Sequence, residues 1–480
     1  MNYSIIKYIL GWVIFIEGSV MILPFITSIF YNEVSGVAFL SVSFICILIG
    51  LLLIRKKPKN PLFFAREGFV TVALSWIVLS IIGALPFTIS GEIPNYIDAL
   101  FETISGFTTT GASIVSRVEN LSKCMLFWRS FTHWIGGMGV LVFILAIMPL
   151  AGGQSMHLMR AESPGPSVSK LVPNLRKTAF MLYLIYFFIT LLQIIILVML
   201  GQPLFDAICN SFATAGTGGF GLYSDSIAHY NNAQQNVITI FMLLFGVNFS
   251  FYYLLLLKRF KDAFNFEEVR YYFAIFAGAV LLITINLTLR DGNLIYNLQH
   301  AAFQSASIMT TTGFATVDFD TWPIFSKSIL VLLMFVGACA GSTGGGIKIS
   351  RILIYFKSSI RELSHLIHPN SIKTIKCDHK PISNNIIRSC YSFFIIYIII
   401  LTTSILLISI EGYDMATNFT AVATALNNVG PGLELVGPSC NFQFFNPFSK
   451  FILMFNMLAG RLEIFPILLM FVPSSWSKER

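Results

Sequence analysis

Four short segments of the sequence carry the residue types of an ion-coordinating backbone. Aligned without gaps on a shared final glycine, they cover 98–111, 206–219, 300–313 and 417–430. The second position is Ala in three copies, the sixth is Thr or Ser in three, and the last is Gly in all four. Glycine reaches backbone angles closed to other residues and adds no side chain. Such backbone could therefore turn carbonyl oxygens toward a common axis, where a ring of them replaces the water shell of an alkali cation.

The last residues of each segment carry no formal charge, which favours a large, weakly hydrated monovalent cation over a divalent one. Small residues also ease helix packing in membranes, and packing would explain any single copy. Four copies in register, each between two apolar spans, are better explained by a repeated unit of span, pore hairpin and span. Hairpins of this kind are tolerated in a bilayer only where protein or water satisfies their backbone.

The composition places these units in a membrane. Of 480 residues, 55% are hydrophobic and only 11% are charged, and the mean hydropathy is +0.76. A soluble domain carries about 25% charged residues. The formal charge of +8 comes from basic residues in short segments between apolar runs, so it indicates membrane orientation and not nucleic-acid binding. The seven cysteines include no CxxC pair, which argues against a disulfide framework or a zinc site.

We predict an all-α integral membrane protein with ten transmembrane helices. A span needs about 20 apolar residues, and the first is expected to be a retained helix, not a cleaved signal. Placing most of the 31 Lys and Arg on the inner side puts both termini in the cytoplasm. The expected spans are 8–30, 35–54, 69–89, 126–150, 179–200, 237–257, 272–289, 324–354 (interrupted), 389–410 and 449–472.

Around one pore, these spans divide into an N-terminal helix pair and four pseudo-repeated helix–pore loop–helix units. The expected divisions are 1–66 for the helix pair, then 67–158, 159–262, 263–364 and 365–480 for the pore repeats, with a gating loop in the third.

The interrupted span contains five glycines between Phe335 and Ser350. Each costs about 1 kcal/mol relative to Ala in a helix interior, so the consecutive Gly344, Gly345 and Gly346 should break the helix. Non-helical backbone at membrane depth must line a cavity. The stretch that ends at Lys348 has some similarity to a phosphate-binding loop, but Ile347 separates the glycines from the lysine.

Other polar residues support no catalytic chemistry. A GxGxxG pattern at 216–221 follows a pore segment and lacks the βαβ context of a dinucleotide site. His133 and His157 stand alone, so we predict no metal site there. The chain also lacks a paired nucleophile and base, so an enzyme is not expected. Glu17, Arg461 and Glu463 lie in apolar spans, where a charge is functional or paired. Arg461 is expected to face the pore or a partner, and an ion pair with Glu463 is an alternative.

Three further motifs lie at 129–139, 341–348 and 460–465. Through these motifs and the four segments, the chain resembles the Trk/Ktr/HKT superfamily of potassium transporters over nearly its whole length. Its two extra N-terminal spans are more similar to the Trk branch than to the shorter KtrB. The resemblance implies potassium uptake across the bacterial inner (plasma) membrane through a selectivity filter and a gated pore. The implied K⁺ filter residues are Thr110, Gly111, Gly218, Gly219, Thr312, Gly313, Val429 and Gly430.

The resemblance also implies a gate and partners. Gly344, Gly345, Gly346 and Lys348 would belong to a loop that obstructs the ion path, and Arg461 would be an electrostatic barrier. The implied assembly is a homodimer in membrane lipid with a cytoplasmic, nucleotide-binding regulator similar to TrkA. ATP or NADH would bind that regulator, and no cofactor would bind this chain.

The four filter segments are not uniform. Gly218 replaces a Thr in the second, and Asn428 and Val429 replace the Thr pair in the fourth. The pore is therefore expected to be only pseudo-fourfold. Some sodium-passing plant relatives carry Ser at the first filter glycine, so Gly111 favours potassium.

A proton- or sodium-coupled potassium symporter is the alternative function. It predicts inverted repeats, broken helices and acidic relays inside the membrane. The expected repeats are parallel, and Glu17 and Glu463 are the acids within the expected spans.

Overall fold

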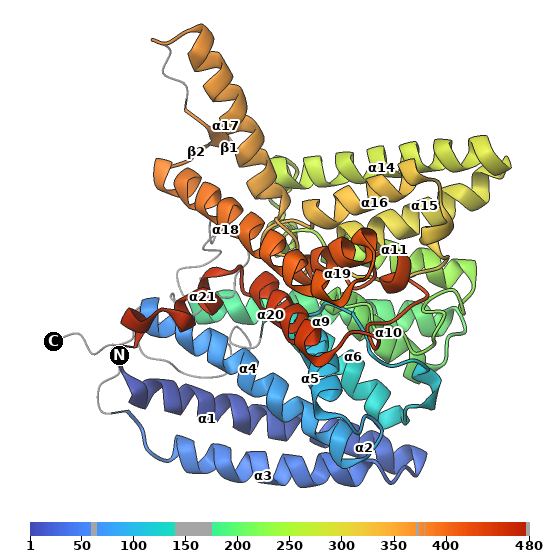
Figure 1. The fold of residues 1–480 in the computed structure, drawn as a ribbon, viewed down its shortest axis with the longest axis vertical. Coiled ribbons are helices and arrows are strands. Elements are labelled where there is room, and N and C mark those ends of the chain that lie inside the picture. Colours follow the sequence, from blue (N-terminus) through green and yellow to red (C-terminus); the bar gives the residue numbers. More distant parts are fainter. Residues whose placement is uncertain (59–64, 140–174, 371–373, 379, 477–480) are drawn as a thin grey trace.

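The computed structural model describes residues 1–58, 65–139, 175–370, 374–378 and 380–476. The described chain is mostly helical (Figure 1). Six of its helices are long and apolar enough to cross a membrane, and a seventh span results if one bent pair is counted as one. Large apolar side chains on their outer faces are exposed, as on α3 (Gly36–Ile54), which suits a surface in contact with lipid. The chain is thus a helical membrane protein.

The predicted count of ten spans remains a prediction. The second half of the expected span 126–150, His157, and the expected boundary between the first two pore repeats at 158 lie outside the described residues.

The N-terminal helices form a close pair beside the rest of the molecule (Figure 1). α1 (Tyr3–Val20) continues into α2 (Ile22–Tyr31), and α3 packs back along α1. Gly18 of α1 lies so close to α3 that an added Cβ would approach the Cβ of Cys46 to 2.7 Å. The Ser43 hydroxyl donates to the carbonyl of Gly18 at 2.6 Å. Small residues and a side-chain hydrogen bond therefore join the two helices, as is common in membranes.

Four short, largely buried helices, called pore helices below, form most of the four segments and end shortly before the expected filter residues. They are α5 (Tyr96–Phe107), α10 (Leu204–Gly216), α15 (Leu294–Met309) and α19 (Met415–Asn427). Three begin at a side-chain cap, in which Asn95, Asn293 and Asp414 accept from a backbone N–H of the first turn. The helices therefore have defined starting points, and their carbonyl ends point to the glycines that follow.

The remaining helices surround these four. Their bounds are α4 (Ala65–Ile89), α6 (Lys123–Gly137), α9 (Leu175–Met199), α11 (Asn232–Phe245), α12 (Phe249–Leu256), α13 (Phe260–Phe264), α14 (Glu267–Asp291), α16 (Ile324–Val336), α17 (Ile349–Ile367), α18 (Asn384–Ile408), α20 (Pro447–Arg461) and α21 (Phe465–Phe471). Single 3-10 turns lie at Val118–Asn120, Phe319–Thr321, Ser409–Glu411, Glu434–Val436 and Pro473–Ser475.

Two expected spans are each divided into two helices. The span 237–257 consists of α11 and α12, which meet at 90°. The span 449–472 consists of α20 and α21, separated by Glu463 and Ile464 at positive φ. The expected interruption within 324–354 is present between α16 and α17, and α17 projects well beyond the helical body (Figure 1). A small antiparallel hairpin, β1 (Lys376–Cys377) with β2 (Lys380–Pro381), departs from the all-α expectation.

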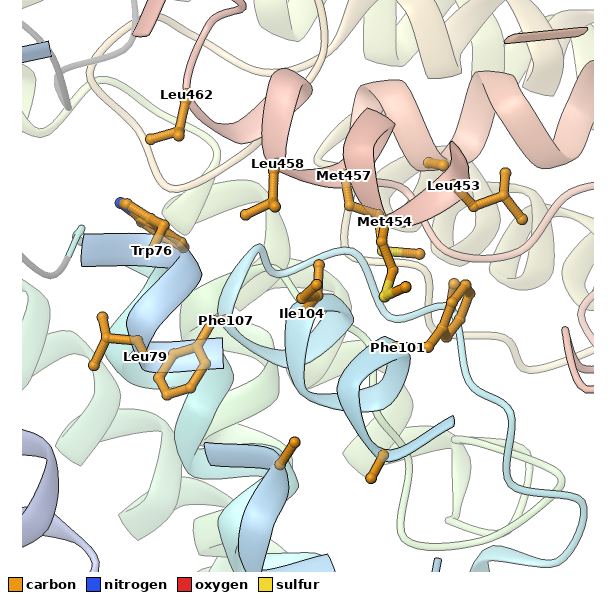
Figure 2. Close-up of a cluster of buried hydrophobic side chains, with 14 of the residues drawn as sticks. Trp76, Leu79, Phe101, Ile104, Phe107, Leu453, Met454, Met457, Leu458 and Leu462 are labelled. Atoms are coloured by element: carbon orange, nitrogen blue, oxygen red, sulfur yellow. The ribbon is translucent and has the colours of Figure 1, made fainter. Parts of the chain in front are cut away.

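The first pore helix, α5, and the outer helix α20 are held together by a shared apolar cluster. Figure 2 shows α4 and α5 facing α20, with Phe107 and Met457 among the buried side chains between them. The cluster's labelled residues are Trp76, Leu79, Phe101, Ile104, Phe107, Leu453, Met454, Met457, Leu458 and Leu462. Segments more than 300 residues apart therefore close the molecule around its centre.

Candidate functional site

All four pore helices end with the same backbone bond. The N–H of Thr110 donates to the carbonyl of Ser105 at 2.9 Å, five residues back. The equivalent bonds of Gly218, Thr312 and Val429 measure 2.8, 2.8 and 2.9 Å. The residue before each one, which is Thr109, Thr217, Thr311 or Asn428, has φ between 54° and 58°. This left-handed helix ending satisfies the last carbonyls of a helix. Four different sequences thus reach one geometry.

The glycines after these residues form a closed ring with the carbonyls of their neighbours. Gly111, Gly219, Gly313 and Gly430 all have positive φ, from 80° to 98°. A Cβ added to Gly111 would lie 2.1 Å from the carbonyl oxygen of Gly218, and one on Gly219 would lie 2.0 Å from that of Thr312. A Cβ added to Gly313 would lie 2.2 Å from the carbonyl oxygen of Val429, and one added to Gly430 would lie 2.8 Å from that of Thr110, which closes the ring. Only glycine allows both the backbone angle and this approach.

The structure therefore brings all eight expected filter residues into one ring, in the order of the sequence. The four helix carbonyl ends face this ring, and a helix C-terminus carries about half a negative charge. Backbone carbonyls with helix dipoles behind them attract a cation without any formal charge.

Side chains behind the ring differ from copy to copy. In the first and third copies, two threonine hydroxyls pair at 2.8 Å (Thr108 and Thr110) and at 2.7 Å (Thr310 and Thr312). In the fourth copy, the Asn428 amide donates to the Thr110 hydroxyl at 3.0 Å and to the Met457 carbonyl at 2.9 Å. A side chain of the fourth copy thus supports the first. The second copy has glycine at both threonine positions.

A buried ion pair supports the outer side of the ring. Arg129 Nε donates to Glu102 Oε1 at 2.8 Å, and both side chains are buried. The same carboxylate accepts from the Ser113 hydroxyl at 3.0 Å and from the Ile114 N–H at 2.9 Å. Glu102 on α5 therefore fixes the strand that leaves the filter. This role of Glu102 was not predicted from the sequence, although an acid in an otherwise apolar pore segment could have indicated it.

The glycine loop between α16 and α17 lies directly against the inner end of the ring. Gly345 N–H donates to the Thr311 hydroxyl at 2.6 Å, and Gly346 N–H donates to the Asn427 carbonyl at 3.1 Å. An added Cβ on Gly344 would lie 2.8 Å from the carbonyl oxygen of Thr310. Gly344 and Gly345 are needed because they touch the backbone of the third and fourth copies with no room for side chains, and Gly346 is needed because it has positive φ and lies against Gly337.

Arg461 and Lys348 line the same cavity as these glycines. Arg461 donates to the Thr343 carbonyl at 2.8 Å and, from the other side of its guanidinium, to the carbonyls of Gly137 at 2.7 Å and of Gly136. Lys348 Nζ donates across the loop to the Gly344 carbonyl. All five expected gating residues are therefore in one place.

The alternative pairing of Arg461 with Glu463 is wrong. Glu463 instead accepts from Arg351 on α17 at 2.5 Å, because the chain turns sharply after Arg461 and residues two apart face different ways. The pairing connects the break between α20 and α21 to the start of α17.

Glu268 holds both ends of the glycine loop. Its Oε1 accepts from the N–H of Ala340 at 2.6 Å and from the N–H of Ser350 at 3.1 Å. The expected span 272–289 leaves Glu268 outside, whereas α14 begins at Glu267. The sequence feature that could have indicated Glu268 is an acid at the N-terminal end of an apolar run.

The fold and the site define a helical membrane protein with a ring of backbone carbonyls above a buried glycine loop. A family model described as "Cation transport protein" (TrkH) matches residues 35–479. The chain is 38% identical to the Trk system potassium uptake protein TrkH of Salmonella typhimurium, covering 99% of this chain and all of that protein. It is 34% identical to TrkG of Escherichia coli K12, with 99% of each covered.

A solved structure agrees with these relatives. The crystal structure of the potassium transporter TrkH from Vibrio parahaemolyticus superposes with a TM-score of 0.89 at 32% identity, and 99% of this chain and all of that chain are covered. The chain belongs to the TrkH family of cation transport proteins. The expected family resemblance is confirmed, and this family is one of transporters, not of enzymes.

Proposed function

We propose that this chain takes up potassium across the bacterial inner membrane, as the translocating subunit of a Trk-type system. The observation that carries this function is the ring in which four glycines abut the carbonyls of Thr110, Gly218, Thr312 and Val429. Full-length relatives named as potassium uptake proteins support it. The ring offers oxygen atoms in place of the hydration shell of K⁺, which loses its water at lower cost than the smaller Na⁺.

Entry is driven by the membrane potential, which is worth about 2.3 kcal/mol per charge for each 100 mV. No covalent chemistry is required of the protein. The eight filter residues bind the ion, and the loop around Gly344, Gly345 and Gly346 obstructs it until the loop moves. Arg461 adds a positive charge to the cavity below the ring, which raises the energy of a passing cation.

The proposed assembly is larger than the chain. We infer ten spans in a helix pair and four pore units, both termini in the cytoplasm, and a homodimer. A TrkA-like cytoplasmic subunit would bind ATP or NADH and move the loop, since this chain needs no cofactor for the passage of K⁺. Gly111 in the first filter segment supports K⁺ over Na⁺.

Uptake in bacteria that lack their own potassium importers tests this function. Cells with the parent chain should grow on low K⁺ and accumulate K⁺ in preference to Na⁺. Gly111→Ser should lose discrimination while the protein stays in the membrane, because a side chain at 111 meets the Gly218 carbonyl. Equal K⁺ and Na⁺ uptake by the parent, or no effect of Gly111→Ser, would show that the ring is not the filter.

Current measurements on the purified protein in planar bilayers separate a pore from a coupled symporter. A pore gives a reversal potential that follows the K⁺ gradient at every pH and Na⁺ concentration. A reversal potential that shifts with a proton or sodium gradient at constant K⁺ would instead establish coupling.

A further inference from the structure

The second filter segment lacks the side chains that support the others. The first and third copies each carry a pair of hydrogen-bonded threonines, at 108 and 110 and at 310 and 312. At the equivalent positions of the second copy stand Gly216 and Gly218. Two missing threonine side chains would leave a void behind one quarter of the ring.

That space is occupied by one residue of α6, His133. A Cβ added to Gly218 would lie 2.1 Å from Nδ1, 2.2 Å from Cγ and 2.5 Å from Cε1 of the His133 ring. A Cβ added to Gly216 would lie 2.2 Å from the carbonyl oxygen of His133. The imidazole therefore fills the place of the side chain at 218, and the backbone of His133 fills the place at 216.

The imidazole is fixed from behind by a chain of contacts. Its ring stacks on Phe220, two residues after Gly218, with centroids 4.3 Å apart. The Arg129 guanidinium lies 4.2 Å from the centroid of the same phenyl ring, and Arg129 is anchored by Glu102. Glu102 also fixes the strand after the first filter segment. The second segment is thus connected through His133 to the support of the first.

Hydrogen bonding does not explain why His133 stands here. It is fully buried, and neither ring nitrogen has a hydrogen-bond partner among the described residues. Burying an unpaired polar group costs free energy. A role that repays this cost must come from the position and the stiffness of the ring, which has only two rotatable bonds and packs flat against Gly218.

We infer that His133 is a specificity-determining positioning residue of the filter. Its imidazole replaces the missing threonine pair and sets the position of the Gly218 carbonyl, so that the second segment matches the other three. This role rests on the proposed potassium function. It assigns to α6 a part in selectivity that the filter sequence alone does not contain.

An exchange of volume between positions 133 and 218 tests the inference, with K⁺ and Na⁺ uptake and the amount of folded protein measured for each variant. His133→Ala should lower the K⁺ to Na⁺ ratio by roughly tenfold, because the second segment loses its support. Gly218→Thr should abolish uptake or folding, because the threonine meets the imidazole. The double variant His133→Ala/Gly218→Thr should recover folding and most of the discrimination, since the threonine then occupies the vacated space.

Gly216→Ala is the matched control. Its methyl group would meet the backbone carbonyl of His133, which His133→Ala does not remove. The pair His133→Ala/Gly216→Ala should therefore remain as defective as Gly216→Ala alone. Rescue of both glycine variants would mean general loosening of the protein and would overturn the inference, as would rescue of neither or parental discrimination in His133→Ala. Gly111→Ser in the same experiment reports on the filter itself, so a failure of the proposed function is recognised separately.

Discussion

At the scale of single residues, Arg461 combines two tasks at one place. It joins the glycine loop to the end of α6 through the carbonyls of Thr343 and Gly137, and it brings a positive charge into the cavity below the ring. A charged side chain at this depth costs at least a few kcal/mol, so its presence here indicates a function.

Arg461→Ala should raise K⁺ flux by roughly tenfold. At an effective dielectric constant of about 20, two like unit charges about 10 Å apart repel by about 1.7 kcal/mol, which sets the scale of the barrier that this charge adds. Arg461→Lys keeps the charge but cannot bridge two elements with a planar fork. If the charge is the barrier, the lysine variant stays close to the parent in K⁺ flux. If the hydrogen bonds that join the loop to α6 are the barrier, Arg461→Ala and Arg461→Lys raise K⁺ flux equally.

The Glu102–Arg129 pair makes a prediction about stability. Removing one partner of a buried ion pair leaves the other charge unpaired, which typically costs 3–5 kcal/mol. Glu102→Ala should therefore lower the melting temperature of the purified protein in detergent. Glu102→Gln/Arg129→Gln removes both charges and should melt nearer to the parent. A melting temperature of Glu102→Ala equal to that of the parent would show that the strand at Ile114 is held by other contacts.

At the scale of elements, the glycine loop is held by hydrogen bonds to two of the filter segments and to Glu268 of α14. Its helical neighbours α16 and α17 cannot continue through three glycines, and the loop instead bonds to Thr311 and Asn427 of the filter. Glu268 closes the loop across Ala340 and Ser350. If the loop is the gate, as proposed, opening breaks these hydrogen bonds, and the bonds to Glu268 contribute to how often the loop moves.

Glu268→Ala should release both ends of the loop and increase K⁺ flux in the absence of any regulator. Glu268→Gln keeps a carbonyl oxygen that accepts the same two N–H groups, so its flux should match that of the parent. Flux through each variant in proteoliposomes, with equal protein incorporated, measures the effect. A glutamine variant as leaky as the alanine variant would show that the charge of Glu268, and not its hydrogen bonds, holds the loop.

The sequence predicted the helices and the glycine interruption better than the turn that divides the last expected span. Whereas the eight filter residues were implied by the family resemblance, the four pore segments and the glycine interruption follow from composition and repeated spacing. The division of 449–472 does not, because it depends on positive φ at Glu463 and Ile464, neither of which is a residue type that favours such angles. Hydropathy averages over a window and cannot detect this turn. The pairing of Arg351 with Glu463 depends on it and was likewise not predictable.

At the scale of the whole molecule, the ring has a seam. Three of its contacts join segments consecutive in the chain, whereas the fourth joins Gly430 to Thr110, at opposite ends of the pore-forming sequence. The apolar cluster between α5 and α20 closes the molecule there (Figure 2). Alignment of the repeats gave the order of the segments but not what closes them, since closure relies on a residue that departs from the repeat.

That residue is Asn428, whose amide group links Thr110 to the Met457 carbonyl. Asn428→Gly keeps the left-handed backbone angle and removes both hydrogen bonds, so the seam should loosen and the K⁺ to Na⁺ uptake ratio should fall several-fold. Thr109→Gly is the matched control, because Thr109 has the same backbone angle in the first copy and its hydroxyl has no hydrogen-bond partner in the described part of the chain. It should leave the ratio unchanged. Equal effects of the two substitutions would mean that backbone flexibility, and not the link across the seam, sets selectivity.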